Sequence, residues 1–206
     1  MTKTKIDWCD YTWNPVWGCR NTCPYCYARK TAQRWCHNFA PHWMENNFNR
    51  VMPKKPSRIF VNSMSEIAYW EPEWWEKVIA RIVENPQHTF LFLTKNPAIY
   101  NSYPLPMNCW LGATATTQNE VDIYQRKLAF FDAHNFLSIE PILEKIDPSS
   151  IKRKFIDWVI LGAETGNRKK RVIPPPEWIE PWLKLPIPLY MKHNLPWDGT
   201  WRREFP

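Results

Sequence analysis

Three cysteines lie close together near the start of the chain, at a spacing that suits an iron–sulfur cluster. Residues 18–28 read GCRNTCPYCYA, which places Cys19, Cys23 and Cys26 in the pattern CxxxCxxC, with Tyr25 directly before the last cysteine. Cysteine thiolates are the usual ligands of 4Fe–4S clusters. Because such a cluster has four irons, three local cysteines leave one iron free of protein ligands. That open iron can bind and reduce a small molecule.

A zinc site is the main alternative for these cysteines. Structural zinc usually takes four ligands, commonly as pairs of cysteine and histidine. Cys36 and His37 lie ten or more residues downstream and could supply a fourth ligand. Disulfides belong mainly to small secreted domains, and Cys9, Cys36 and Cys109 are scattered thiols outside the loop. We therefore expect a 4Fe–4S cluster and keep zinc as the alternative.

The composition indicates one folded domain spanning residues 1–206. The chain is 44% hydrophobic, which excludes a disordered polypeptide. No apolar run approaches the roughly 18 residues of a membrane span, and the N-terminal stretch lacks the apolar core of a secretory signal. We expect a cytoplasmic protein with no membrane association. A net charge of +7 and 14 tryptophans permit a nucleic-acid partner, through phosphate contacts and base stacking.

Apolar strand patterns alternate with helical patterns along most of the chain. After an irregular stretch at 41–57, the pattern repeats up to the last predicted strand. The predicted strands are 1–17 (an extended lead-in), 58–66, 88–97, 108–119, 135–143, 155–167 and 187–194; the predicted helices are 27–40, 71–86, 120–134 and 174–185.

Unbroken apolar strands between helices favour a parallel sheet or barrel. A complete eight-fold barrel needs ~250 residues, so we predict an α/β fold of the partial, open (β/α)6-type TIM barrel, with mainly parallel strands. Ligands in such folds collect at the carboxyl ends of strands. The polar residues expected at that edge, besides the cysteine loop, are Ser63, Ser65, Lys95, Thr114, Thr116, Glu140, Glu164 and Lys192.

The pattern CxxxCx(aromatic)C resembles the signature of the radical S-adenosylmethionine (SAM) superfamily. The wider set WNPVWGC, CPYCYA, FVNSMSE, TFLFLTKNP, WLGAT, FLSIEPIL, DWVILGAETG and LYMKH resembles a phage-associated radical-SAM family of unknown function. These blocks extend from about residue 13 to residue 194. Spore photoproduct lyase, which acts on nucleic acid, is more distantly similar.

The resemblance implies an enzyme that reductively cleaves SAM at the open iron of a 4Fe–4S cluster. The resulting 5′-deoxyadenosyl radical would abstract a hydrogen atom from a substrate, for which nucleic acid is a candidate. Reduced flavodoxin or ferredoxin would supply the electron. The alternative is a zinc- or iron–sulfur-bearing nucleic-acid-binding module without radical chemistry.

The resemblance also implies roles for the residues that bind the cofactors. Cys19, Cys23 and Cys26 would ligate the cluster, and Tyr25 would pack near the cluster and the adenine of SAM. Ser63 and Ser65 would meet the SAM amino group, Lys95 its carboxylate, and Thr114 and Thr116 the ribose hydroxyls. Core packing for Tyr25 and helix capping for the serines are the structural alternatives.

Three charged residues at later strand ends are candidates for catalysis. Glu140 and Glu164 could bind the ribose or the sulfonium surroundings, or act on substrate as acid and base, and Lys192 could contact an anion or the substrate. Ion pairs of the glutamates with Lys95, Arg171 or Lys192 are the alternative. The run RKKR at 168–171 is either a solvated loop or a phosphate clamp.

Overall fold

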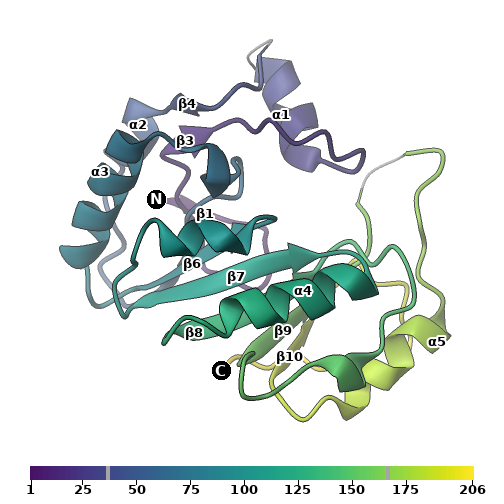
Figure 1. Cartoon of the computed structure of the whole chain (residues 1–206). Helices are drawn as coiled ribbons and strands as arrows, with labels where there is room; N and C mark the ends of the chain where they lie inside the picture. Colours follow the sequence, from purple (N-terminus) through teal and green to yellow (C-terminus); the bar gives the residue numbers. More distant parts are fainter. Residues whose placement is uncertain (36–37, 166–167) are drawn as a thin grey trace. The chain divides into compact units, whose positions relative to one another are not determined.

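A computed structural model describes residues 1–35, 38–165 and 168–206. The chain forms two compact units, Met1–Trp110 and Leu111–Pro206. In Figure 1 the first unit runs from purple to teal and the second from green to yellow. Within the described residues, no helix is long and apolar enough to cross a membrane.

The first unit contains a sheet with the strand order β1-β2-β5-β6. Strand β1 (Thr2–Lys3) pairs antiparallel with β2 (Tyr11–Thr12), whereas β2, β5 (Arg58–Phe60) and β6 (Thr89–Thr94) run parallel. A separate antiparallel pair is formed by β3 (Val16–Trp17) and β4 (His42–Trp43). The helices are α1 (Tyr27–Trp35), α2 (Glu45–Phe48) and α3 (Pro72–Val83), with 3-10 helices η1 (Ile67–Tyr69) and η2 (Pro97–Asn101).

The second unit also contains strands of a sheet, in the order β7-β8-β9-β10. Its strands are β7 (Cys109–Ala115, which begins in the first unit), β8 (His134–Ile139), β9 (Trp158–Leu161) and β10 (Leu189–Met191). Strand β9 runs parallel to both β8 and β10. The remaining elements are α4 (Gln118–Leu128), η3 (Pro148–Ser150), α5 (Pro176–Ile179) and η4 (Glu180–Lys184).

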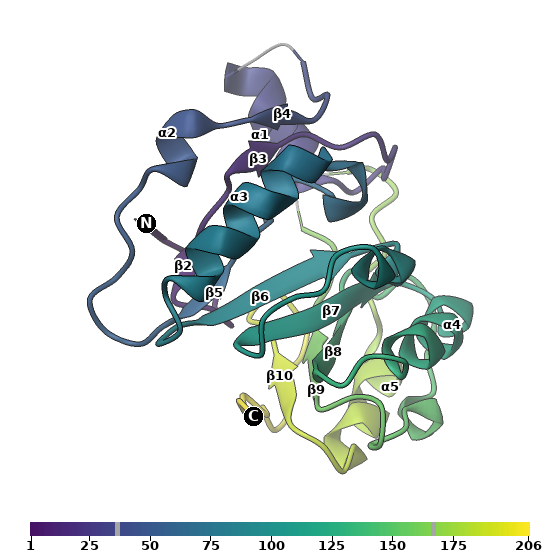
Figure 2. The ribbon, with the colours of Figure 1, turned by 60° about the vertical axis from the view of Figure 1, so that its left-hand side comes forward.

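Burial explains why these segments form strands and helices. All four residues of β9 are buried, as expected for a parallel strand covered on both faces. Helix α3 begins with a proline at its first turn and buries Trp75, Val78 and Ile82 along one face. Trp75 stacks on Phe92 of β6, with ring centroids 6.0 Å apart, so α3 packs against that strand (Figure 2).

The mixed α/β class with mainly parallel strands is confirmed, and six of the predicted strands are found with shorter bounds. The lead-in 1–17 is wrong as one strand, because it is divided into β1, β2 and β3. The predicted helix 27–40 ends at Trp35, although positions 36 and 37 lie outside the described residues. The segment 174–185 forms α5 and then η4, since Pro181 has no N–H to continue an α-helix. The irregular stretch 41–57 contains β4 and α2.

Candidate functional site at the cysteine loop

Gly18 fixes the start of the cysteine loop beside the segment that follows β5. Its φ of 103° lies in the left-handed region that favours glycine. A Cβ at Gly18 would lie 2.1 Å from the carbonyl oxygen of Ala40. The Gly18 N–H donates to the Met64 carbonyl at 3.0 Å, and the next N–H, of Cys19, donates to Phe39 at 2.9 Å. Backbone contacts therefore hold the loop at the carboxyl end of β5.

The three thiols of the loop are free and partly buried. Burial raises the pKa of the Cys19 thiol to about 11, against an opposing hydrogen bond from Asn21, and the charges of Glu66, Cys26 and Cys23 add to the rise. Two of the sulfurs accept backbone hydrogen bonds. The Asn21 N–H lies 3.2 Å from the Cys19 Sγ, and the Arg29 N–H lies 3.3 Å from the Cys26 Sγ.

Side chains from α1 and η1 support the backbone of the loop. The Arg29 guanidinium donates to the carbonyl oxygens of Cys19 at 3.2 Å and Asn21 at 2.7 Å. It also lies 5.0 Å above the ring of Phe39. From η1, the Tyr69 hydroxyl donates to the Asn21 side-chain oxygen at 2.7 Å. None of these bonds uses a thiol, so the sulfurs are left available as ligands.

The donor types of this loop, thiols with nearby backbone N–H groups, are those that thiolate-bound iron–sulfur clusters use. Backbone N–H donors to ligand sulfurs and an apolar shell are what such clusters use to set their properties. Here Cys19 and Cys26 pack against a buried apolar group formed by Ala28, Ala32, Phe39 and Met64. Among the described residues, no three or more His, Cys, Asp or Glu side chains are grouped to hold a metal ion. Cys36 and His37, the candidates for a fourth ligand in the alternative zinc site, lie outside the described residues.

The structure brings Tyr25 and Lys95 together. The Lys95 Nζ lies 5.4 Å from the centroid of the Tyr25 ring, a cation–π arrangement between the cysteine loop and the end of β6. The structural alternative of core packing does not describe Tyr25, which is only partly buried.

Ser63 and Ser65 do not cap a helix. The Ser63 hydroxyl donates to the side chain of Asn14 at 3.0 Å, and the Ser65 hydroxyl accepts from the Trp70 indole at 3.0 Å. The N-cap of η1 is Glu66, whose own carboxylate accepts from the Ala68 N–H. Each serine hydroxyl still has acceptor capacity for a further donor.

Glu66 is a buried carboxylate beside this site that the sequence reasoning missed. It is 6% exposed and accepts hydrogen bonds from the Thr94 hydroxyl and from the backbone N–H of Lys95, the latter at 2.9 Å. Burial raises the pKa of Glu66, whereas these hydrogen bonds and the Lys95 charge act in the opposite direction. The available signal was an acidic residue in the polar run after a buried strand. Its partners lie 28 and 29 positions away and leave no local pattern.

In the second unit, Glu140 and Lys192 form an ion pair. Their side chains are 24% and 12% exposed. Gly162 makes room for this pair, since a Cβ there would lie 3.1 Å from the Lys192 Cδ and 3.2 Å from the Glu140 Cδ. Two of the three predicted catalytic residues, Glu140 and Lys192, are therefore in contact. This contact is the ion pair considered above as the structural alternative to a catalytic role.

Glu164 is paired with Arg168. The guanidinium of Arg168 donates two hydrogen bonds of 2.7 Å to the two carboxylate oxygens, and the Glu164 side chain is only 1% exposed. This fork-shaped pairing is a strong form of carboxylate recognition. Arg168, the first residue of the RKKR run, is thus not part of a freely solvated loop, whereas Lys169, Lys170 and Arg171 are exposed.

The two predicted threonines lie at and just beyond the end of β7. Thr114 is within the strand and partly exposed. Thr116 is buried, and both its N–H and its hydroxyl donate to the Glu120 carboxylate, at 2.6 Å and 2.8 Å. The carboxylate of Glu120, which the sequence reasoning also missed, holds Thr116 at the start of α4.

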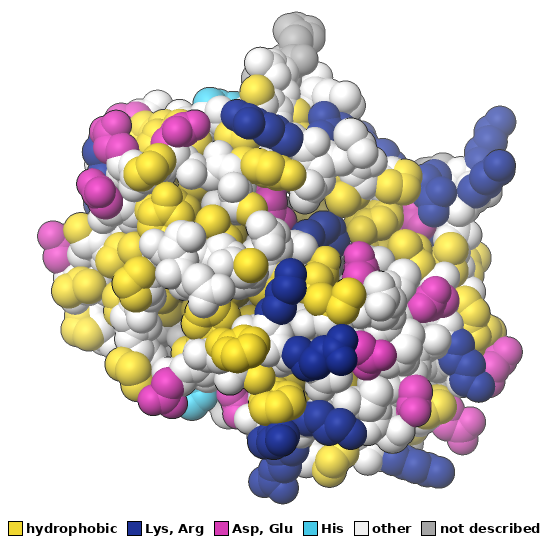
Figure 3. All heavy atoms as spheres, viewed as in Figure 1, with side chains coloured by type: hydrophobic (Ala, Val, Ile, Leu, Met, Phe, Trp, Pro, Cys, Tyr) yellow, Lys and Arg dark blue, Asp and Glu magenta, His cyan; other side chains and the backbone are white. Residues whose placement is uncertain are grey.

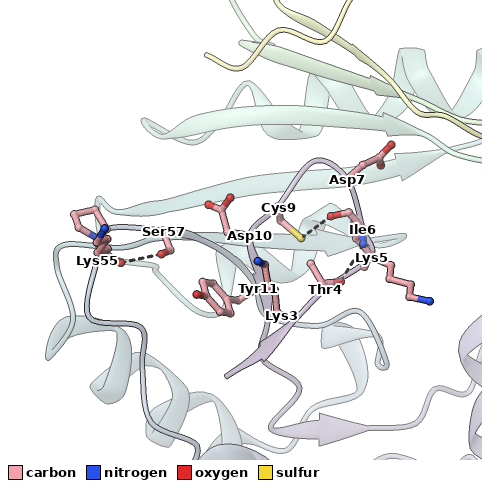
Figure 4. Close-up of a pocket in the computed structure, with 11 residues that line it drawn as sticks. Lys3, Thr4, Lys5, Ile6, Asp7, Cys9, Asp10, Tyr11, Lys55 and Ser57 are labelled. Carbon is pink, nitrogen blue, oxygen red and sulfur yellow. Dashed lines mark hydrogen bonds between the residues drawn. The ribbon is translucent and has the colours of Figure 1, made fainter.

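A separate cavity of about 620 Å³ lies at the amino ends of β2 and β5 (Figure 4). It is lined by 3–7, 9–11 and 55–57 and includes none of the predicted site residues. Several of its polar groups bond to one another. The Thr4 hydroxyl accepts from the Ile6 N–H at 3.0 Å, and the Ser57 hydroxyl donates to the Lys55 carbonyl at 2.8 Å.

The fold and site define a mixed α/β protein with a three-cysteine loop at the carboxyl end of a parallel strand. A family model described as a protein of unknown function, DUF5131, matches residues 3–183, so the chain belongs to the DUF5131 family. No curated protein and no solved structure matches the chain.

Proposed function

We propose that this protein is a radical SAM enzyme built on a partial, open (β/α)6-type barrel. Cys19, Cys23 and Cys26 would ligate a 4Fe–4S cluster whose fourth iron binds SAM. The observation that carries the proposal is the cysteine loop itself. It carries three thiols within eight residues of the chain, two of them accept backbone N–H bonds, and backbone contacts hold the loop beside the end of β5.

When bound, the reduced cluster and SAM supply a carbon-centred radical that abstracts hydrogen from a substrate. In this reading Lys95 pairs with the carboxylate of SAM, and the Tyr25 ring below its ammonium limits where that charge can move. Glu66 fixes the backbone of Lys95 through the 2.9 Å hydrogen bond. Ser63 and Ser65 offer hydroxyl lone pairs to the SAM amino group.

The strand ends of the second unit would serve the ribose and the substrate. Thr114 and Thr116 remain the proposed ribose contacts. Glu140 and Lys192 are the proposed acid/base pair, because their side chains are partly exposed and already share a proton-bearing contact. Glu164 has a different role in this proposal, since it holds Arg168 in a fixed position and leaves that cation to meet an anionic group.

The charge of the cysteine segment supports an acidic partner. Residues 11–44 contain no Asp or Glu, whereas they include Arg20, Arg29, Lys30 and Arg34. Lys and Arg side chains lie over α1 in Figure 3. Such a surface would attract an acidic reductase such as flavodoxin or ferredoxin, and it would also attract a nucleic-acid substrate. Binding of DNA or RNA that weakens steeply with added salt would favour the nucleic-acid substrate.

The test is anaerobic reconstitution with iron and sulfide, followed by dithionite and SAM. The expected results are a brown protein with iron and acid-labile sulfide, and formation of 5′-deoxyadenosine. Cys23→Ala should lose both the cluster and the product. Cys9→Ala, which removes a buried thiol outside the loop, should retain both. Zinc without sulfide in the oxygen-protected protein would overturn the proposal and favour a zinc-bearing nucleic-acid-binding module.

A further inference from the structure

The indole of Trp17 is a buried hydrogen-bond donor without an acceptor. Its Nε1 is shielded from solvent and has no hydrogen-bond partner within the part of the chain that the structure describes. An indole N–H can only donate, and buried polar groups are paired in most proteins. Two other tryptophans of the same unit follow that rule. Trp13 donates to the Asn47 carbonyl at 3.1 Å, and Trp70 donates to the Ser65 hydroxyl at 3.0 Å.

The neighbours of Trp17 distinguish it from a simple packing defect. Its ring packs on the apolar group of Ala28, Ala32, Phe39 and Met64, and the thiols of Cys19 and Cys26 pack on the same group. Trp17 is the last residue of β3, two positions before Cys19. By contrast, Trp75 also has an unpaired buried indole but is surrounded by the rings of Trp70, Phe92 and Tyr103.

We propose that the Trp17 N–H donates a hydrogen bond to an anionic sulfur of the cluster, either a ligand thiolate or an inorganic sulfide. This inference rests on the proposed function, because it needs the cluster to supply the acceptor. A neutral thiol is a weak acceptor, whereas a metal-bound thiolate or sulfide carries negative charge. In this inference, the acceptor for the Trp17 N–H is a group that would arrive with the cluster.

A donor at this position has a defined effect on the redox chemistry. Reduction adds an electron and makes the cluster sulfurs better acceptors. A hydrogen bond to them stabilises the reduced form more than the oxidised form and raises the reduction potential. Trp17 would thus act as a positioning and tuning residue that makes the cluster easier to reduce, without contacting the substrate.

The experiment compares Trp17→Phe with Trp75→Phe, since each replacement keeps an aromatic ring and removes one unpaired buried N–H. Anaerobic redox titration followed by electron paramagnetic resonance measures the potential of the reconstituted cluster. We expect Trp17→Phe to shift the potential to a more negative value, and Trp75→Phe to leave it at the wild-type value. Equal potentials in all three proteins would overturn this inference and leave the proposed function standing.

A second measurement covers the case in which Trp17→Phe fails to fold or to load. Wild-type protein with ¹⁵N in its tryptophan indoles should show a ¹⁵N coupling in the pulsed spectrum of the reduced cluster. Absence of that coupling would overturn the inference. A wild-type protein that forms no cluster at all would overturn the inference and the proposed function together, and iron and sulfide analysis identifies that outcome.

Discussion

The ammonium of Lys95 lies 5.4 Å from the ring centroid of Tyr25. The contact joins the end of β6 to the residue between the second and third cysteines of the loop. A cation over an aromatic face gains modest attraction and remains able to pair with an anion on its open side. The backbone N–H of Lys95 also donates a hydrogen bond to the carboxylate of the buried Glu66. Contacts therefore position both the main chain and the side chain of Lys95.

Replacement of Lys95 by methionine should weaken SAM binding while the cluster is retained. Loss of one charge-assisted hydrogen bond costs about 1.5–3 kcal/mol, which corresponds to an increase in Kd of roughly 10- to 100-fold. Equilibrium dialysis with labelled SAM measures the affinity. Lys55→Met, in the cavity at the amino ends of the strands, is the matched control and should bind SAM as the wild type does. Unchanged affinity in Lys95→Met would exclude this role.

Gly162→Ala should disturb the Glu140–Lys192 pair. The added methyl would lie 3.1–3.2 Å from carbon atoms of both side chains, closer than ordinary van der Waals contact. Overpacking of this kind typically costs about 1–3 kcal/mol of the unfolding free energy, which urea denaturation measures. In a Lys192→Ala background the cost should fall, because one of the crowded side chains is gone. An equal cost in both backgrounds would show that the strain lies elsewhere.

The Asp10–Arg58 pair should make the unfolding free energy depend on pH in the acidic range. Burial of the Asp10 carboxyl favours its neutral form, but the hydrogen bonds and charge of Arg58 outweigh that effect and hold the pKa below its ordinary value. A lowered folded-state pKa contributes stability above the unfolded-state pKa, and this stability is lost as the pH falls through the folded-state value. The unfolding free energy of the wild type should therefore fall toward that of Asp10→Asn below about pH 4. A constant difference in unfolding free energy between the wild type and Asp10→Asn down to pH 2 would contradict the stabilising role of this ion pair.

Cys109 should resist alkylation in the native protein. Burial raises the pKa of its thiol to about 12, and the residue is 1% exposed. Since the thiolate is the reactive form, iodoacetamide at pH 8 should leave Cys109 unmodified until the chain is unfolded in urea. Peptide mass spectrometry reads the modification. Cys23 of cluster-free protein, which is only partly buried, serves as the internal comparison and should react in the native state.

The sequence predicted the features that depend on local patterns and missed those that depend on distant partners. Apolar runs located six strands, whereas the metal ligation expected from the cysteine spacing stays a prediction. The pairing of Glu140 with Lys192 joins residues 52 positions apart, so it was one option among several ion pairs. The role of Glu66 depends on the end of β6, and the division of residues 1–17 into short strands depends on separate partners.

The anchor at Gly18 has a consequence for how far the cysteine loop depends on its own side chains. The path of the chain into Cys19 is set by main-chain bonds to Met64 and Phe39 and by a close approach to Ala40 that no side chain allows. Because these restraints involve no sulfur, they are independent of any group that the thiols bind. Replacement of Cys19, Cys23 or Cys26 by alanine should therefore leave the path of the chain into the loop unchanged.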